Sequence, residues 1–313
     1  MIKTINELHN LLRGTFLELN DIVEMTVLDT SETVFAIDVK NFNSFEAWSL
    51  LRDLADQIGR WPVLTALWAD PSKSFDEQLK NANLFSRFYF KDECRDNRRG
   101  DNPDAIIEAS DGIDVAQYFA SLPLDDSLSI EDAVEIALEG TQGEFGKVPL
   151  IEDRLAFLRN ESLSTHDDIE QWFFEWEIKH CANPLSLPEY GLAHMKWFEP
   201  ESEALLLMPS LRDWEIPAYI NWFAAGGGRC NSQFIVALLE EWHSKYGAEL
   251  VAHHGTMLHF VVARRPSTPK EAFHLAWQQN MVAPCTIILP GVSLRDHARA
   301  LLHTNKWFLH ERP

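Results

Sequence analysis

The order of helix- and strand-forming segments in the last third of the chain constrains the fold most. Apolar runs at 204–208, 249–253 and 257–263 have the length and composition of strands, and the last two flank Gly255 as in a hairpin. Amphipathic segments separate the other strands, and an apolar run at 284–289 predicts one more strand. A hairpin beside helical crossovers predicts a mixed sheet with helices packed on it, which is an α+β fold.

Four of the predicted helices begin at a Ser or Thr that is followed three residues later by an acid. Such a pair can bond the free N–H groups of the first helical turn, so it marks the start of a helix. The pairs are Ser129 with Asp132, Thr165 with Asp168, Thr268 with Glu271, and Ser293 with Asp296. Ser44 is predicted to cap a fifth helix, which the apolar spacing continues as far as Gly59.

A cluster of glycine and proline predicts a boundary in the middle of the chain, at Gly143, Gly146 and Pro149. We therefore expect two α/β modules joined by a helical segment. The predicted parts are an acidic N-terminal α/β module (1–150), a helical connecting segment (151–203) and a C-terminal α+β domain (204–313). A strand followed by a helix is predicted in both halves, at 34–48 and at 205–219, which leaves open whether the halves arose by duplication.

Charge is the strongest signal about partners. The chain carries 27 Lys and Arg against 48 Asp and Glu, a net charge of −21. Residues 1–150 contain 28 acids and 13 bases, which is 15 of the 21 excess negative charges. A field of this sign repels nucleic-acid phosphates and the anionic lipids of a membrane, so neither is an expected partner. The same field attracts a basic protein, although acidity can also serve solubility alone.

The cysteines indicate the compartment. Cys94, Cys181, Cys230 and Cys285 are far apart in the sequence and form no Cys-x-x-Cys pair. This usage is typical of a reducing compartment and predicts no disulfide. The N-terminus has no long apolar run, and no apolar stretch is long enough to span a membrane. We therefore expect a cytoplasmic protein.

Several short segments of the last third carry a family resemblance. They lie at 214–219, 226–230, 239–242 and 265–266, and the most specific is 246–251. With them, residues 204–303 resemble a bacterial family known only as a domain of unknown function, number 4253. The resemblance implies an α+β fold and a bacterial origin, and it supplies no activity and no catalytic residues.

His254 and His259 are the strongest candidates for metal ligands. On a hairpin that turns at Gly255, both side chains would lie on one face of the sheet, because side chains alternate along strands. Glu249 or His243 could then complete a transition-metal site. The alternative is that both are ordinary strand histidines on a partly exposed face, since no third ligand stands at a diagnostic spacing.

Two other features could carry chemistry. Cys230 is predicted at a helix N-terminus, where a thiolate is stabilised, and it or Cys285 could act as a nucleophile with a histidine. The preceding turn at 226–229 could hold an anion on its backbone N–H groups, with help from Arg229. Inert buried thiols and a turn that needs glycine are the simpler interpretations. No sequence motif indicates a cofactor, so none is expected.

Aromatic residues are abundant, with 11 tryptophans in the chain. Trp172, Phe174 and Trp176 cluster with Phe173 on one predicted helix, and a single narrow stripe cannot bury all of them. Part of this cluster is therefore expected to face a protein partner or the other module.

Acidity, aromatic residues and the missing catalytic signature together favour a non-enzymatic protein that binds another protein. The specific hypothesis is an immunity or antitoxin-like protein that masks a basic bacterial effector. Asp92, Glu93 and Asp96 are expected to contribute to its acidic surface.

The alternative is an enzyme with a site that involves Cys230, His254 or Glu249. This alternative requires the three groups to converge in one pocket and to have perturbed pKa values.

Overall fold

The computed structural model describes residues 1–27, 30–39, 42–68, 70–82, 84–85, 102–122, 129–159, 165–187, 190–222 and 230–312. The chain forms two compact units, and each combines segments that are far apart in the sequence. Unit 1 comprises residues 1–118, 196–264 and 305–313. Unit 2 comprises residues 119–195 and 265–304.

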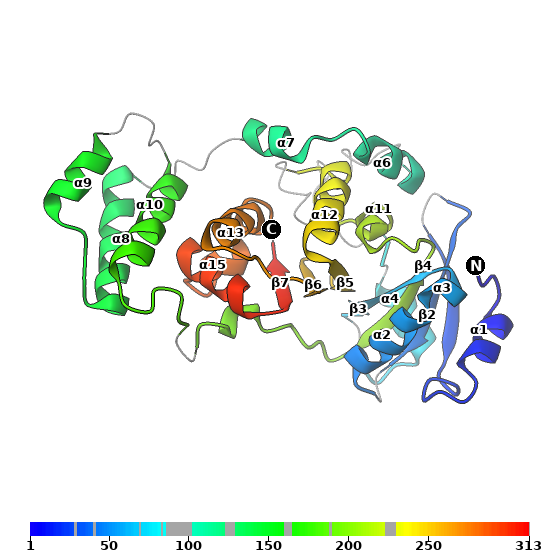
Figure 1. Cartoon of the computed structure of the whole chain (residues 1–313). Helices are drawn as coiled ribbons and strands as arrows, with labels where there is room; N and C mark the ends of the chain where they lie inside the picture. The colour runs from blue at the N-terminus through cyan, green and yellow to red at the C-terminus, as the bar shows by residue number, and fades with distance from the viewer. Residues whose placement is uncertain are drawn as a thin grey trace. The chain divides into compact units, whose positions relative to one another are not determined.

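Unit 1 contains a mixed sheet whose strand order is β1-β2-β4-β3-β5-β6-β7 among the residues described (Figure 1). The strands are β1 (Ile22–Thr26), β2 (Thr33–Asp38), β3 (Trp61–Ala66), β4 (Glu203–Met208), β5 (Ala248–His253), β6 (Met257–Val262) and β7 (Lys306–His310). Neighbouring strands are antiparallel except β3 and β5, which run parallel. The predicted α+β fold with a mixed sheet is confirmed, and so is the predicted hairpin, which is β5–β6.

Helices cover both faces of this sheet (Figure 1). On one face lies α2 (Ser44–Asp53), where Nε1–H of Trp48 donates to the Pro62 carbonyl of β3 at 3.0 Å. On the other lie α11 (Ile216–Tyr219) and α12 (Ser232–Tyr246), where Trp242 meets Phe260 of β6 edge to face. All six residues of β3 are buried between these layers. The other helices that begin in unit 1 are α1 (Ile5–Leu12), α3 (Ala55–Ile58), α4 (Phe75–Ala82), α6 (Pro103–Ser110) and α7 (Val115–Ser121).

Local sequence signals explain where these helices begin and end. The side chain of Asn43 caps α2, one residue before the predicted cap at Ser44. Gly247 ends α12 with a φ of +60°, in the left-handed region that favours glycine. A Cβ at Gly247 would lie 2.8 Å from the Cβ of Ala263, so the close approach of the chain requires glycine as well.

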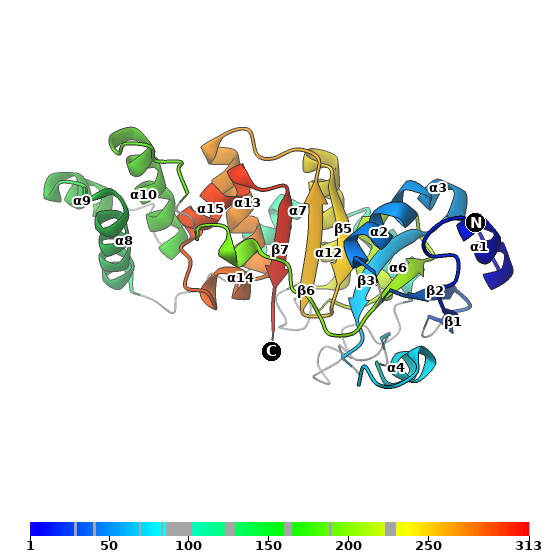
Figure 2. The same cartoon turned by 90° about the horizontal axis from the view of Figure 1, so that it is seen from below.

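Unit 2 contains helices and no strand among the residues described. Its helices are α8 (Ile130–Phe145), α9 (Ile151–Leu158), α10 (His166–His180), the 3-10 turn η1 (Ala193–Met195), α13 (Pro269–Val282), α14 (Cys285–Ile288) and α15 (Leu294–His303). The core between α8, α9 and α10 consists of Ala133, Ala137, Phe157, Ile169 and Phe173. A second pair, α13 and α15, packs side by side (Figure 2). The predicted caps Ser129, Thr165, Thr268 and Ser293 all accept a backbone N–H from the residue three positions on.

The apolar run at 284–289 forms helix α14, so the strand predicted there is wrong. Pro284 has helical backbone angles, and its carbonyl accepts the N–H groups of Ile287 and Ile288 at 3.1 and 3.0 Å. A short apolar run does not distinguish a buried strand from a helical turn, whereas a proline favours the first turn of a helix. The sequence did not predict the two edge strands, β1 and β7; β1 contains no buried residue, whereas Trp307 and Leu309 of β7 are buried.

The compact units also differ from the predicted modules. Strand β4, in the predicted C-terminal domain, lies between β2 and β3 of the predicted N-terminal module. The boundaries at 150 and 203 therefore separate strands of a single sheet. Helices α13 to α15 belong to unit 2, together with α8 to α10, rather than to the sheet. Sequence patterns report neighbours along the chain, and strand pairing between distant segments leaves no such pattern.

Candidate functional site

The C-terminal ends of the two parallel strands form the first candidate site, because ligands of open sheets commonly bind at that position. β3 ends at Ala66, and β5 is followed directly by His254. Nδ1 of His254 accepts the N–H of Ala66 at 2.9 Å, which places the ring proton of a neutral His254 on Nε2. The ring centroids of His254 and His259 are 4.8 Å apart, so the two histidines lie together as the hairpin predicted.

His259 is held by the segment that leads into β4. Its Nε2 accepts the backbone N–H of Phe198 at 3.2 Å, and its ring stacks on Trp197 with centroids 5.2 Å apart. Burial, aided by the charge of Lys306, lowers the pKa of His259 to about 3. His254 and His259 are 1% and 3% exposed, so the alternative of a partly exposed face is wrong. His259 is neutral near pH 7, and its unprotonated nitrogen already has a donor.

Glu203, the first residue of β4, adds a carboxyl group to this end of the sheet. Its Oε1 lies 3.9 Å from Nε2 of His254. Burial raises the pKa of Glu203 to about 7, although a hydrogen bond with Ser44 acts in the opposite direction. Trp68, just after β3, has a φ of +52° and stacks on Phe198. Sequence reasoning missed Glu203, because a single acid at the start of an apolar strand carries no distinctive pattern.

The other predicted metal ligands do not join the histidine pair. Glu249 stands near the opposite end of β5, where it accepts hydrogen bonds from Arg52 at 3.0 and 2.5 Å. Nδ1 of His243 lies 3.1 Å from Oδ1 of Asp213, and this hydrogen bond raises the pKa of His243. In the part of the chain that the structure describes, no three His, Cys, Asp or Glu side chains are grouped to hold a metal.

The cysteine candidates are also distributed over the fold. Cys230 lies at the N-terminal end of α12, as predicted, and is buried. Cys285 opens α14 and therefore belongs to unit 2. Because Glu249 and His254 stand at opposite ends of β5, the three residues of the predicted enzyme site do not converge. Cys181, Cys230 and Cys285 form no disulfide. Cys94 and the turn at 226–229 lie outside the described residues.

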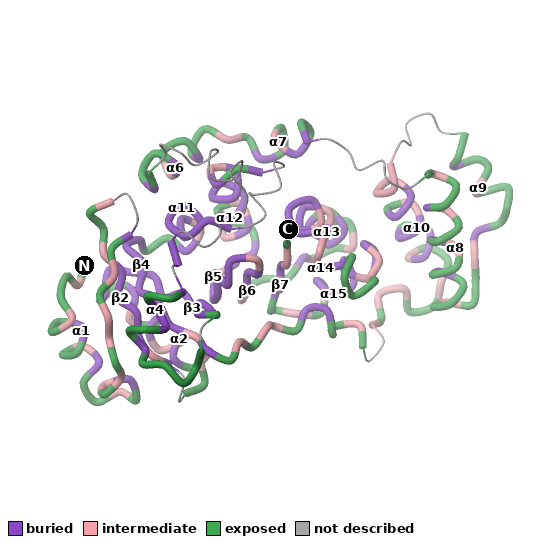
Figure 3. Tube along the Cα trace, turned by 180° about the vertical axis from the view of Figure 1, so that it is seen from behind, coloured by how far each residue is buried: buried purple, intermediate pink, exposed green. Residues whose placement is uncertain are grey.

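The aromatic residues of α10 pack within unit 2. Phe173 belongs to the core with α8, and Phe174 stacks on Phe273 of α13 with ring centroids 5.6 Å apart. Trp172 is half-buried against an aromatic ring of α9, and Trp176 is buried. Figure 3 shows buried residues on α10, which packs against α8 and also near α13 and α15. Burial on more than one side of this helix means that the aromatic cluster does not require a partner.

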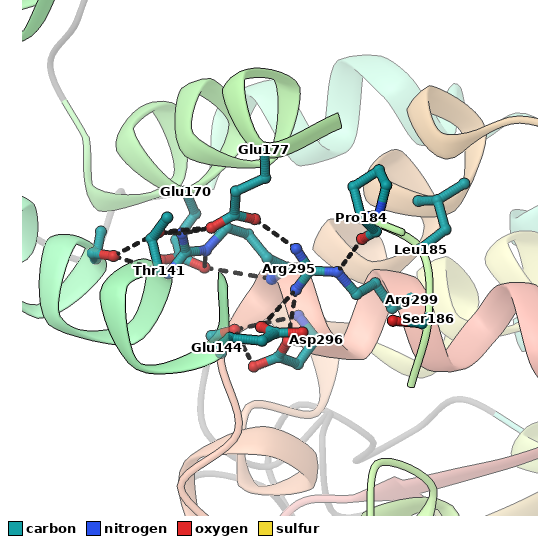
Figure 4. A network of polar contacts seen from close by, with 12 residues as sticks. Thr141, Glu144, Glu170, Glu177, Pro184, Leu185, Ser186, Arg295, Asp296 and Arg299 are labelled. Atoms are coloured by element: carbon teal, nitrogen blue, oxygen red, sulfur yellow. Dashed lines mark hydrogen bonds and ion pairs between the residues drawn. The ribbon is translucent and has the colours of Figure 1, made fainter. Parts of the chain in front are cut away.

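A buried ionic network joins α10 and α15 of unit 2 (Figure 4). Arg295 and Arg299 both pair with the carboxylate of Glu177, and Arg295 also pairs with Glu170 at 3.2 Å. These four side chains are at most 5% exposed. Burial alone would lower the pKa of Arg299, but the surrounding carboxylates outweigh burial and raise it. The two glutamates are seven residues apart and the two arginines four apart, so each pair lies on one face of its helix. This spacing is a sequence signal from which the ionic network could have been predicted.

An acidic groove lies on unit 1, between the end of α6, the start of α7 and the C-terminal half of α12. It has a volume of about 640 Å³. Three carboxylates and one amine line it, from Asp111, Glu240, Glu241 and Lys245. Val115 and Ala237, both buried, contribute apolar surface. Asp92, Glu93 and Asp96, the acids expected to matter most, lie outside the described residues.

The chain is thus an α+β protein with a mixed sheet. Residues 204–310 match a domain family described as "Domain of unknown function (DUF4253)", which confirms the resemblance predicted over 204–303. A search of the curated proteins found no match to the chain, and neither did a search of the solved structures. No helix among the described residues is both long and apolar enough to span a bilayer.

Proposed function

We propose that this chain is a cytoplasmic, non-enzymatic interaction protein that binds a positively charged protein. In the specific form of the proposal, it masks a basic bacterial effector as an immunity protein or antitoxin does. The acidic groove of unit 1 carries this proposal, because both carboxylates and apolar side chains line it. An arginine or lysine of a partner can place its charge beside Asp111 or Glu240 while its aliphatic stem covers Val115 and Ala237.

The charge of the whole chain supports the same proposal. At −21, the protein attracts a basic partner over distances comparable to the Debye length, which is about 8 Å at physiological salt. This attraction mainly speeds the encounter, whereas contacts in the groove determine how long the complex lasts.

The test compares two charge-neutralised variants as bait. The groove variant carries Asp111→Asn and Glu240→Gln, and both positions are exposed. The control variant carries Glu46→Gln and Asp56→Asn, which are exposed elsewhere on unit 1 and remove the same charge. Proteins captured from the native host are quantified by mass spectrometry. We expect a basic protein that the wild type and the control retain and the groove variant loses. Equal capture by both variants would refute a role for the groove.

One observation favours a second candidate function, which is acid–base catalysis. The carboxyl group of Glu203 has a pKa raised to about 7 by burial and lies 3.9 Å from Nε2 of His254. A group that titrates near neutral pH suits general acid–base chemistry. Activity on a small molecule that Glu203→Gln abolishes, with no macromolecular partner captured, would favour this candidate over the interaction protein.

A further inference from the structure

The sheet of unit 1 has a seam between β3 and β5, the two strands that run parallel (Figure 2). Strands β1, β2, β4 and β3 lie on one side of the seam, and β5, β6 and β7 lie on the other. Among the residues described, one pair is in register across the seam, Leu64 with Ala252. The start of β5 therefore needs other partners for its backbone groups, since buried N–H and C=O groups are rarely left unbonded.

Side chains supply those partners at Leu250 of β5. Nε1–H of Trp61 donates to the carbonyl of Leu250 at 3.0 Å. The N–H of Leu250 donates to Oδ2 of Asp213, in the 3-10 turn η2 (Asp213–Glu215), at 2.8 Å. Asp213 is 2% exposed, so its carboxylate is a buried charge at the start of β5. A buried carboxylate is costly unless a charge of opposite sign lies beside it.

His243 of α12 is the group that can supply this charge. Its Nδ1 lies 3.1 Å from Oδ1 of Asp213 and 3.0 Å from the carbonyl oxygen of Ala248. Both neighbours are acceptors, so Nδ1 carries a proton in either charge state of the ring. In the part of the chain that the structure describes, no other donor reaches Oδ1 of Asp213. The side chain of His243 is 34% exposed, so it can exchange a proton with solvent.

We propose that Asp213 and His243 form a proton-dependent clamp on the seam between β3 and β5. When both ring nitrogens of His243 are protonated, the ring neutralises Asp213 and so fixes the acceptor of the Leu250 N–H. When Nε2 loses its proton, Asp213 becomes a buried charge held by neutral donors, and the start of β5 loosens. The clamp concerns the conformation of unit 1 and does not depend on the proposed function.

The surrounding charges do not replace the cation. Glu249 of β5 adds a second negative charge beside the pair, which favours the protonated ring. The carboxylate of Glu249 is itself paired with Arg52 of α2 at 2.5 Å. Glu215 of η2 is paired with Arg212 at 2.9 Å. These two arginines therefore already have carboxylate partners.

The clamp should act on the acidic side of its titration. The contact with Asp213 raises the pKa of His243, although partial burial acts in the opposite direction. Burial raises the pKa of Asp213, while His243 and the N–H of Leu250 act in the opposite direction. A raised histidine pKa in the folded protein gives stabilisation that is fully present below about pH 6.5, the ordinary pKa of an imidazole. This stabilisation is lost as the pH rises through the pKa of His243.

The test compares the full-length wild type with His243→Gln, because glutamine can still donate an N–H to Asp213 but cannot carry the charge. Hydrogen exchange of 248–253 is measured by mass spectrometry between about pH 6 and about pH 9 and is corrected for the intrinsic exchange rate at each pH. The protection in the wild type is divided by that in His243→Gln. Glu203, which titrates near pH 7, is present in both proteins, so the ratio cancels its contribution.

We expect this ratio to exceed one at the acidic end of the range and to fall as the pH rises. The fall should be tenfold for every difference of one between the pKa of His243 in the folded protein and in the open state. The change should be larger over 248–253 than over β1 and β2, which lie on the other side of the seam. The control His9→Gln, at an exposed position on α1 of unit 1, should match the wild type at every pH.

An NMR titration of the histidine ring provides an independent readout. The midpoint of His243 in the wild type should lie above about 6.5 and should fall in Asp213→Asn. This measurement on the wild type decides the question if His243→Gln does not fold.

Three results would overturn the clamp. The first is a protection ratio that does not change with pH. The second is a His243 midpoint at or below about 6.5, or one that Asp213→Asn leaves unchanged. The third is an equal change over β1 and β2, because the pair would then stabilise unit 1 as a whole rather than the seam.

Discussion

Replacing Glu177 by glutamine should destabilise unit 2 strongly. The carboxylate of Glu177 is 1% exposed and accepts a hydrogen bond from Nη1 of Arg295 at 2.6 Å and another from Oγ1 of Thr141 at 2.6 Å. It also pairs with Arg299, which is itself 1% exposed. A neutral amide keeps the size of the side chain but leaves two buried guanidinium groups with one compensating charge fewer.

The remaining partners set the magnitude of the effect. Arg295 keeps Glu170 at 3.2 Å, and Arg299 keeps Asp296 at 2.6 Å. Removing one partner of a buried ion pair costs about 3–5 kcal/mol, and these surviving pairs place Glu177→Gln near the lower end, at about 3 kcal/mol. A local loss of that size accelerates hydrogen exchange roughly a hundredfold, provided that exchange follows the opening equilibrium.

Hydrogen exchange measured by mass spectrometry can locate the loss. Peptides from 166–180 and 294–303 should lose protection in Glu177→Gln. The matched control is Glu175→Gln, an exposed position on the same helix whose carboxylate bonds only the side chain of Gln171 at 3.0 Å among the contacts described. We expect the control to lie within about 0.5 kcal/mol of the wild type. Equal protection of α10 and α15 in both variants would refute the claim that this network stabilises unit 2.

Three further predictions concern unit 1 and the family domain. Burial raises the pKa of Glu203 from 4.5 in the unfolded chain to about 7 in the folded protein. The stability of the wild type should therefore be greatest below pH 4.5 and should fall by roughly 3 kcal/mol as the pH rises through 7 and the buried carboxyl group ionises. Urea titrations of Glu203→Gln should therefore show a gain over the wild type that is larger near pH 8 than near pH 5, and a pH-independent difference would contradict this sign. The isolated segment 204–310 should fail to fold, because it lacks β3, the strand that joins β4 to β5 in the sheet. A cooperative thermal unfolding transition of this fragment would contradict the prediction. Gly247→Ala should lower the melting temperature more than Gly146→Ala. Both glycines have a positive φ, but only at Gly247 would the added methyl group lie 2.8 Å from the Cβ of Ala263. Equal shifts in melting temperature would contradict the packing argument.

The features that the sequence predicts well are those that local chemistry decides. Thr165 and Thr268 begin helices because their side chains bond N–H groups three residues away, and Gly247 ends one because of its own φ. The hairpin β5–β6 joins segments that are adjacent in the sequence, so its pairing also follows from the local pattern.

Features that depend on distant pairing could not be predicted in this way. Nothing in residues 203–208 indicates that β4 inserts between β2 and β3, and this insertion is the reason that the predicted module boundaries differ from the compact units. The same holds for the candidate site. His254 and His259 were found because they flank one turn, while Glu203 reaches them only through the sheet. The sequence indicated correctly that one apolar stripe cannot bury both Trp172 and Phe174. It does not show that α10 has neighbours on more than one side, against which these side chains pack within unit 2.

The proposal that this protein binds a basic partner is tested most directly by the association rate of the captured partner as a function of ionic strength. The Debye length falls from about 10 Å at 0.1 M salt to about 3 Å at 1 M salt, so a rate governed by a net charge of −21 should fall steeply over this range. We predict that fall for the wild type, and a shallower dependence for the Asp111→Asn and Glu240→Gln groove variant. A rate that does not change with salt, or a protein that turns over a small molecule and captures no macromolecule, would contradict the proposal.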